Sequence, residues 1–111
     1  ERACPTMKES VIQKQIMAEF GALPWLRIWR NNSGALKDQR GQLITYGLKG
    51  SADILGLTAP DGRFLAIEVK NERGRQSESQ AAFERMIKSM GGIYILARSV
   101  DDVYRGLNLK E

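Results

Sequence analysis

The sequence predicts one α/β domain over residues 1–111, in which a mixed β-sheet is flanked by helices. A length of 111 residues suits a single small domain, and 42% hydrophobic with 27% charged residues is typical of a globular chain. Apolar residues recur at helical spacing in two segments and cluster in strand-like runs elsewhere. One helical segment links two of these runs, so the strands that it joins can be parallel.

The expected elements follow the order helix, strand, short hairpin, two strands, helix, strand, helix. They are a helix over 7–20, a strand over 25–31, a hairpin within 33–50, strands over 52–58 and 63–70, a helix over 77–90, a strand over 93–97 and a helix over 99–107. Met7 is expected to be the natural start of the chain, with residues 1–6 left over from cloning.

Apolar stripes at intervals of three and four residues predict the two long helices. The stripes consist of Val11, Ile12, Ile16 and Phe20 in the first helix, and of Phe83, Ile87 and Met90 in the second. Ser99 is a residue type preferred at the N-cap, so we expect it to cap the last helix.

Aromatic and β-branched residues predict the strands over 25–31 and 93–97. Residues 59–62 predict a tight turn between two strands, because proline presets the first turn position and glycine accepts a left-handed one. In the glycine-punctuated segment before them, Leu36 is expected to pair with residues 43–45.

The composition excludes several kinds of chemistry. The chain has no histidine, which excludes a Ser-His-Asp triad and any histidine-ligated metal. Its single cysteine, Cys4, excludes an internal disulfide and a cysteine-ligated zinc, and it fits a reducing intracellular compartment. No apolar run approaches the roughly 20 residues of a membrane span, and no signal peptide is visible.

The positive charge of the chain favours one kind of partner, and its lack of histidine and of a second cysteine limits which metals it could bind. A net charge of +4 and a pI of about 9.5 favour a polyanion such as nucleic acid. A metal would need oxygen ligands, which suit Mg²⁺, Mn²⁺ or Ca²⁺.

Glu68 is unusual because it interrupts an otherwise apolar strand. Glu68 and Lys70 are two residues apart, so their side chains share one face, and Leu65, Ile67 and Val69 face the other way. A buried carboxylate is costly unless it is paired or holds a cation. Two interpretations stay open: an ion pair with Lys70 or an arginine, and a metal ligand.

Asp53 starts the preceding strand, and the length of the turn decides whether it meets Glu68. With a four-residue loop, Thr58 faces Arg63, and Asp53 lies directly opposite Glu68 with β-carbons about 5 Å apart. A three-residue loop would send the two carboxylates to opposite faces unless a bulge restored the parity. Adjacent carboxylates repel, which proteins tolerate mostly around a divalent cation. The alternative is an Asp53 that only accepts hydrogen bonds from nearby backbone amides.

Glu9 and Gln80 extend the apolar stripes of the two long helices, so their side chains are expected to face the sheet. Each also fits a capping box, with Thr6 and Ser77 as the N-cap residues. Both interpretations stay open.

These residues form a pattern that resembles a known nuclease signature. The segment 50–53 (GSAD), a hairpin, and then Glu68-Val69-Lys70 resemble the D-(x)n-E-x-K signature of the PD-(D/E)XK nuclease superfamily, with Ala52 where the superfamily pattern has proline. Within it, the chain is similar to a stand-alone virus-type replication-repair nuclease (VRR-Nuc) domain of phage or bacterial type. The matching segments are Glu9, 30–34 (RNNSG), 49–56 (KGSADILG), 67–70 (IEVK) and 77–80 (SESQ).

The resemblance implies a restriction-endonuclease-like fold and a Mg²⁺- or Mn²⁺-dependent endonuclease that cuts structured DNA such as Holliday junctions or flaps. It implies that Asp53, Glu68 and the Val69 carbonyl hold one or two metal ions, that Glu9 supports the metal, that Lys70 is catalytic, and that Gln80 is an accessory residue. Such a cation neutralises a phosphate oxygen and lowers the pKa of a bound water, while Lys70 is expected either to orient that water or to stabilise the developing charge.

Loop residues beside this site are expected to contact DNA phosphates, the alternative for each being a solvated rim. They are Arg30, Asn32, Lys49, Ser51, Arg73 and Arg75. Symmetric cutting of a junction needs two sites, so a homodimer is expected. Its interface would use apolar residues left over from the core, with Trp25, Trp29, Tyr46 and Tyr94 as candidates.

Two other functions fit the same residues. The first is a non-catalytic nucleic-acid-binding module on the same fold, which keeps the basic rim and needs no metal. The second is a small structural or partner-binding domain in which Glu68 and Lys70 form a plain ion pair.

Overall fold

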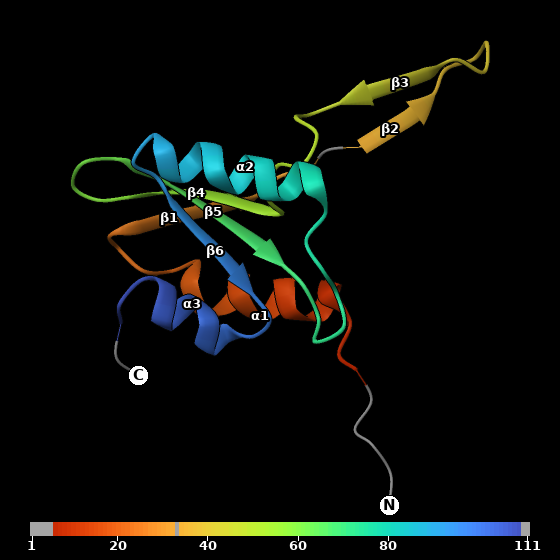
Figure 1. Ribbon diagram of the computed structural model, residues 1–111. Coiled ribbons are helices and arrows are strands. Elements are labelled where there is room, and N and C mark those ends of the chain that lie inside the picture. Colours follow the sequence, from red (N-terminus) through yellow and green to blue (C-terminus); the bar gives the residue numbers. More distant parts are fainter. Residues whose placement is uncertain (1–5, 33, 110–111) are drawn as a thin grey trace, which may run out of the picture.

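The computed structural model describes residues 6–32 and 34–109, without the side chains of residues 34–36 and 45–46. Cys4, Ser33 and residues 1–5 of the expected cloning remnant therefore lie outside the described residues. The elements are α1 (Glu9–Phe20), β1 (Leu26–Arg30), β2 (Gly34–Lys37), β3 (Leu43–Tyr46), β4 (Ile54–Thr58), β5 (Arg63–Val69), α2 (Glu78–Ser89), β6 (Ile93–Ala97) and α3 (Val100–Gly106). The mixed α/β class predicted from the sequence is confirmed (Figure 1). No helix within the described ranges combines the length and apolar character needed to cross a membrane.

Four strands form the central sheet in the order β1-β4-β5-β6. The strands β1, β4 and β5 pair antiparallel, whereas β6 pairs parallel with β5. Helix α2 makes the crossover between β5 and β6, because parallel neighbours need a long connection. The expected parallel pair is therefore present.

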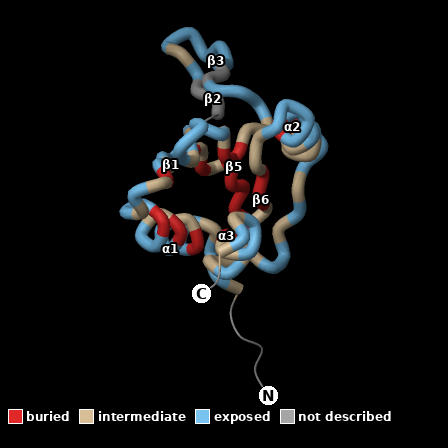
Figure 2. Tube along the Cα trace, turned by 90° about the vertical axis from the view of Figure 1, so that its left-hand side faces the viewer, coloured by how far each residue is buried: buried red, intermediate tan, exposed pale blue. Residues whose placement is uncertain are grey.

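Helices cover both faces of this sheet. In Figure 1, α2 lies on one face and α1 with α3 on the other. Leu65, Ile67 and Val69 of β5 belong to the core beneath α1 and α3, whereas Ala66 packs with residues of α2. Figure 2 shows the buried residues gathered along β5, β6 and α1. The alternation expected for β5 is confirmed, and it puts Glu68 on the face of α2.

The hairpin of β2 and β3 forms a separate two-stranded sheet that projects from the body of the domain (Figure 1). Leu36 pairs with Ile44, as the sequence predicted. Leu43 and Ile44 are exposed. The chain enters this arm after Asn31 and returns from it before Ser51, so both of its ends adjoin the residues around Asp53.

At two helix starts, the side chains that the sequence offered as caps make no capping hydrogen bond. Helix α1 begins at Glu9 with Lys8 at the N-cap, so Glu9 occupies the first helical position and cannot close a capping box. Thr6 instead donates a hydrogen bond to Glu72. Ser99 occupies the N-cap position of α3, but its side chain makes no capping hydrogen bond. The first apolar stripe is also narrower than expected, since Val11 is exposed.

Gly50 brings the loop before Asp53 against the start of α2. Its φ is +82°, and a β-carbon there would lie 2.4 Å from the Ser79 carbonyl oxygen. Only glycine permits both the left-handed backbone and this close approach. The contact therefore fixes the loop that leads to Asp53 against the turn that carries Gln80.

We predict that Gly50→Ala destabilises the protein by at least about 1 kcal/mol more than Gly62→Ala, because added atoms in a packed contact cost about 1–3 kcal/mol. Gly62 is the matched control, since its φ is +69° but a β-carbon there would meet no described atom within 4 Å. Urea unfolding of both variants measures the difference. Equal losses for both variants would show that the backbone conformation alone matters.

Candidate functional site

The register of the β4–β5 hairpin brings the two predicted carboxylates together. Thr58 pairs with Arg63 and Ile54 pairs with Ile67, so residues 59–62 form a four-residue loop, which is one of the two lengths that the sequence left open. Continued by one residue, this register sets Asp53 opposite Glu68. Both side chains then lie on the face of the sheet that α2 covers.

Asp53 is held by the strand that it faces. Its Oδ2 accepts a hydrogen bond of 2.8 Å from the backbone N–H of Val69, and its own carbonyl oxygen accepts one of 2.8 Å from the N–H of Asn31. The carboxylate thus bonds a backbone amide, as the alternative interpretation supposed, but that amide belongs to β5 and adjoins Glu68. The bond therefore orients Asp53 toward the site.

Glu68 is the one buried charged residue among those that the structure describes, with 2% of its surface exposed. Its Oε2 accepts a hydrogen bond of 3.0 Å from Nε2 of Gln80 and lies 3.5 Å from Nζ of Lys70. Its Oε1 is buried and has no hydrogen-bond partner within the described part of the chain. The ion pair with Lys70 is therefore present, yet it leaves half of the carboxylate unsatisfied.

Burial disfavours the ionisation of both carboxyl groups. Burial raises the pKa of Glu68 to about 7, and the nearby Asp53 carboxylate adds to the rise, while Lys70 opposes it. Burial also raises the pKa of Asp53, against the lowering effect of the Val69 N–H. A pair that resists carrying two charges at neutral pH favours a cation or a shared proton between its members.

Gln80 makes both of the contacts that the sequence left as alternatives. Its Oε1 accepts a hydrogen bond from the backbone N–H of Ser77, and the Ser77 hydroxyl accepts one from the N–H of Gln80, which completes the capping box. Its Nε2 is then directed to Glu68. The cap fixes the amide, so one side chain both starts α2 and orients the buried carboxylate.

Glu9 lies beside the loop that follows β5 and not in a common ligand set with Asp53 and Glu68. Its Oε2 accepts a hydrogen bond of 3.3 Å from the N–H of Asn71. A β-carbon on Gly74 would lie 2.8 Å from this oxygen and 3.1 Å from Cδ of Lys70, so Glu9 and Lys70 both border Gly74. No group of three or more acidic, histidine or cysteine residues within 6–32 and 34–109 is arranged to hold a metal. The assignment of Glu9 as a metal ligand stays a prediction.

The residues that fix this loop were not predicted from the sequence. The Asn71 side chain accepts hydrogen bonds from the N–H groups of Arg73 and Gly74, which closes a tight turn. Arg98, at the end of β6, donates to the carbonyl oxygens of Asn71 and Gly74. An asparagine shortly before a glycine is a turn signal that could have revealed Asn71. Arg98 gives no such signal, because its partners are distant in sequence.

The predicted DNA-contacting residues divide into two groups. Arg30, Asn32 and Ser51 line a cavity of about 230 Å³ that also borders Asp53. The others, Lys49, Arg73 and Arg75, are exposed and do not line it. Arg73 and Arg75 lie on the loop between Lys70 and α2.

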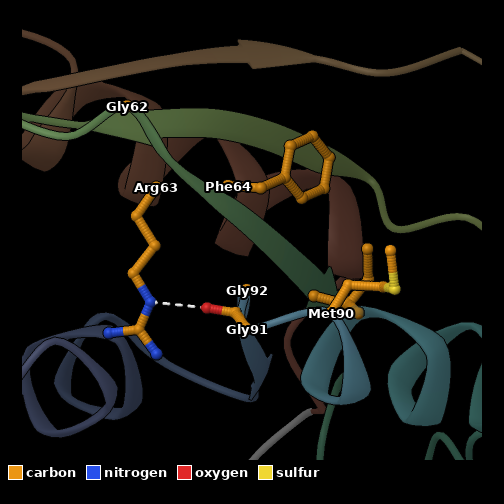
Figure 3. Close-up of a pocket in the computed structure, with 7 residues that line it drawn as sticks. Gly62, Arg63, Phe64, Met90, Gly91 and Gly92 are labelled. Carbon is orange, nitrogen blue, oxygen red and sulfur yellow. Dashed lines mark hydrogen bonds between the residues drawn. The ribbon is translucent and has the colours of Figure 1, made fainter.

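A second cavity lies at the turn end of the β4–β5 hairpin, away from Asp53. It measures about 390 Å³ and is bordered by Phe64, Ile87 and Met90 (Figure 3). Arg63 donates a hydrogen bond of 2.7 Å to the carbonyl oxygen of Gly91 at its edge. It contains no acidic side chain, so it offers none of the chemistry of the Asp53–Glu68 pair.

The aromatic residues considered for a dimer interface have different environments. Tyr94 is buried against Phe83 in the core beneath α2, and Trp25 packs against the other core. Trp29 is 44% exposed and stays available for a partner. The side chain of Tyr46 lies outside the described residues.

Comparison with known proteins gives no family assignment. Neither a scan of protein-family models nor a search of curated proteins finds a match to this chain. The geometry around Asp53 and Glu68 therefore carries the functional argument.

We predict that, without divalent metal, Glu68→Gln raises the free energy of unfolding by about 1–2 kcal/mol at pH 8 and changes it little at pH 4.5. The carboxyl has a folded-state pKa of about 7 against an ordinary value of 4.5. The stabilisation of the folded state by the protonated Glu68 carboxyl is therefore complete below pH 4.5 and is lost as the pH rises through 7. Urea unfolding across this pH range measures the change.

Glu84→Gln is the control on α2. The pKa of Glu84 is lowered, mainly by its hydrogen bond with Lys88. The ionised Glu84 carboxylate therefore stabilises the folded state above its ordinary pKa, which is the reverse of the effect at Glu68. This variant should not gain stability at pH 8. A Glu68→Gln variant with the same stability difference at both pH values would contradict the prediction.

Proposed function

We propose that the chain is a Mg²⁺- or Mn²⁺-dependent endonuclease that hydrolyses phosphodiester bonds in branched or flapped DNA. The observation that carries this proposal is the buried Glu68, which faces Asp53, contacts Lys70 and has one oxygen without a hydrogen-bond partner among the described residues. A resemblance to VRR-Nuc domains of the PD-(D/E)XK superfamily rests on the same residues and supports the same reaction.

The donor set fits a hard divalent cation. Asp53 and Glu68 offer carboxylate oxygens, including the Glu68 Oε1 that has no hydrogen-bond partner among the described residues. The resemblance to VRR-Nuc domains adds the carbonyl oxygen of Val69 as a third ligand. Glu9 accepts a hydrogen bond from Asn71 in the loop after β5, and we propose that it acts on the ion through water. When bound, one or two such ions would neutralise phosphate charge and make water a better nucleophile.

Lys70 is suited to act on the reacting phosphate. It follows β5, its side chain is 13% exposed, and its Nζ lies 3.5 Å from Oε2 of Glu68. A cation held at the edge of a largely buried site stabilises negative charge that develops on a phosphate oxygen. Gln80 keeps Glu68 in place by donating to the oxygen that Lys70 also contacts.

The substrate and the assembly follow from charge and symmetry. Exposed basic residues surround the site, and the chain has a net charge of +4, so a nucleic-acid backbone is the favoured partner. We propose a homodimer, because paired cuts in a junction need two sites related by a two-fold axis. The exposed Trp29 is the candidate aromatic contact between the copies.

We predict that Asp53→Asn and Glu68→Gln each lower the cleavage rate at least about a hundredfold, with DNA affinity in Ca²⁺ kept within about threefold. Each substitution removes a carboxylate oxygen that is proposed to hold the ion. Neither substitution removes a side chain that is proposed to contact phosphate. The measurement compares linear duplex, flap and four-way junction DNA in Mg²⁺, Mn²⁺ and EDTA.

Lys70→Ala should also lose cleavage. The matched control is Lys88→Ala, which removes a lysine from a surface ion pair with Glu84 on α2 and should cut normally. DNA binding without cleavage in any metal, and unaffected by EDTA, would instead identify a non-catalytic nucleic-acid-binding module. Absence of salt-dependent DNA binding would instead favour the second alternative, a structural or partner-binding domain in which Glu68 and Lys70 form a plain ion pair.

A further inference from the structure

The cavity beside Asp53 lies between α1, the end of β1 and the loop before β4. It measures about 230 Å³, and polar residues provide nearly all of its lining. The lining residues are Gln13, Arg30, Asn31, Asn32, Ser51, Ala52 and Asp53. A cavity with such a lining suits a polar or charged ligand better than an apolar one.

Three side chains around this cavity have no partner in the described part of the protein. Within residues 6–32 and 34–109, Gln13, Arg30 and Asn32 make no side-chain hydrogen bond and no ion pair. They come from two different elements, α1 and the end of β1 with the residues that follow it. Together they offer one guanidinium and two amide groups, which are the donors that bind a phosphate.

Asn31 also borders the cavity and makes hydrogen bonds to the residues that lead into Asp53. Its Nδ2 donates to the Ser51 hydroxyl at 2.7 Å and to the Ala52 carbonyl oxygen at 3.0 Å, and its backbone N–H donates to the Asp53 carbonyl oxygen at 2.8 Å. These bonds tie the end of β1 to the residues that lead into Asp53. The position of the cavity relative to Asp53 is therefore fixed by the fold.

We propose that this cavity binds the phosphodiester next to the one that is cut, with Arg30 as its charge partner and Gln13 as a hydrogen-bond donor. The inference rests on the proposed nuclease function, because it places the cavity along the substrate strand that passes Asp53. It assigns Gln13, which no sequence pattern singled out, to substrate binding. It also distinguishes Arg30, which borders the cavity, from the other basic residues near the site, which do not.

The test uses DNA in which one linkage at a time near the cleavage point is replaced by an uncharged methylphosphonate. Affinity for intact DNA is measured by fluorescence anisotropy in Ca²⁺. For the unaltered protein, methylphosphonate replacement of one linkage beside the cut should weaken binding about tenfold. Arg30→Ala should weaken binding to unmodified DNA by a similar factor and show no further loss at that linkage. Gln13→Ala should lose about threefold, with a reduced effect at the same linkage.

Lys14→Ala is the matched control, because it removes one positive charge from an exposed position next to Gln13 on α1. This variant should keep the full tenfold effect at the sensitive linkage. Arg30→Ala that stays as sensitive as the unaltered protein at every linkage would overturn the inference, and so would the absence of DNA binding. Metal-dependent cleavage is measured separately. Cleavage by a protein in which Arg30→Ala leaves the linkage effect unchanged would refute only the cavity proposal. Loss of the linkage effect in Arg30→Ala without any cleavage would refute only the nuclease proposal.

Discussion

The opposition of two carboxylates in a buried hairpin is the constraint on which the rest of the site depends. Asp53 and Glu68 face each other because a four-residue turn sets the register of β4 and β5. Ionisation of both groups is costly there, and burial together with Asp53 raises the pKa of Glu68 to about 7. Such an arrangement is unfavourable as a purely structural feature, and the proposed divalent cation would offset this cost by taking the place of the proton.

The surrounding fold keeps the pair from relaxing apart. The Val69 N–H holds Asp53, and the capped Gln80 holds Glu68 from α2. Gly50 lets the loop before Asp53 approach the backbone of Ser79, so this loop packs directly against the start of α2. Each constraint comes from a different element, which is how a small domain can preorganise a site with few residues.

The sequence revealed most of the sheet because the sheet depends on local rules. Alternation along β5 placed Glu68 on the α2 face, but the sequence left open whether the turn has three or four residues. The four-residue turn of the structure sets Glu68 opposite Asp53. The start of α1 was placed too early, since the Thr6 hydroxyl finds a partner in Glu72, far away in sequence. The bonds from Arg98 to the loop after β5 were missed for the same reason. Contacts between distant segments leave no periodic pattern in the chain.

Carbon-13 NMR titration of the Glu68 side-chain carboxyl tests the central claim most directly. Without divalent metal, this carboxyl should titrate near pH 7, and added Mg²⁺ should shift its titration to lower pH by competing with the proton. A carboxyl that titrates near its ordinary value of 4.5, or that titrates near 7 with no response to Mg²⁺ or Mn²⁺, would contradict the account.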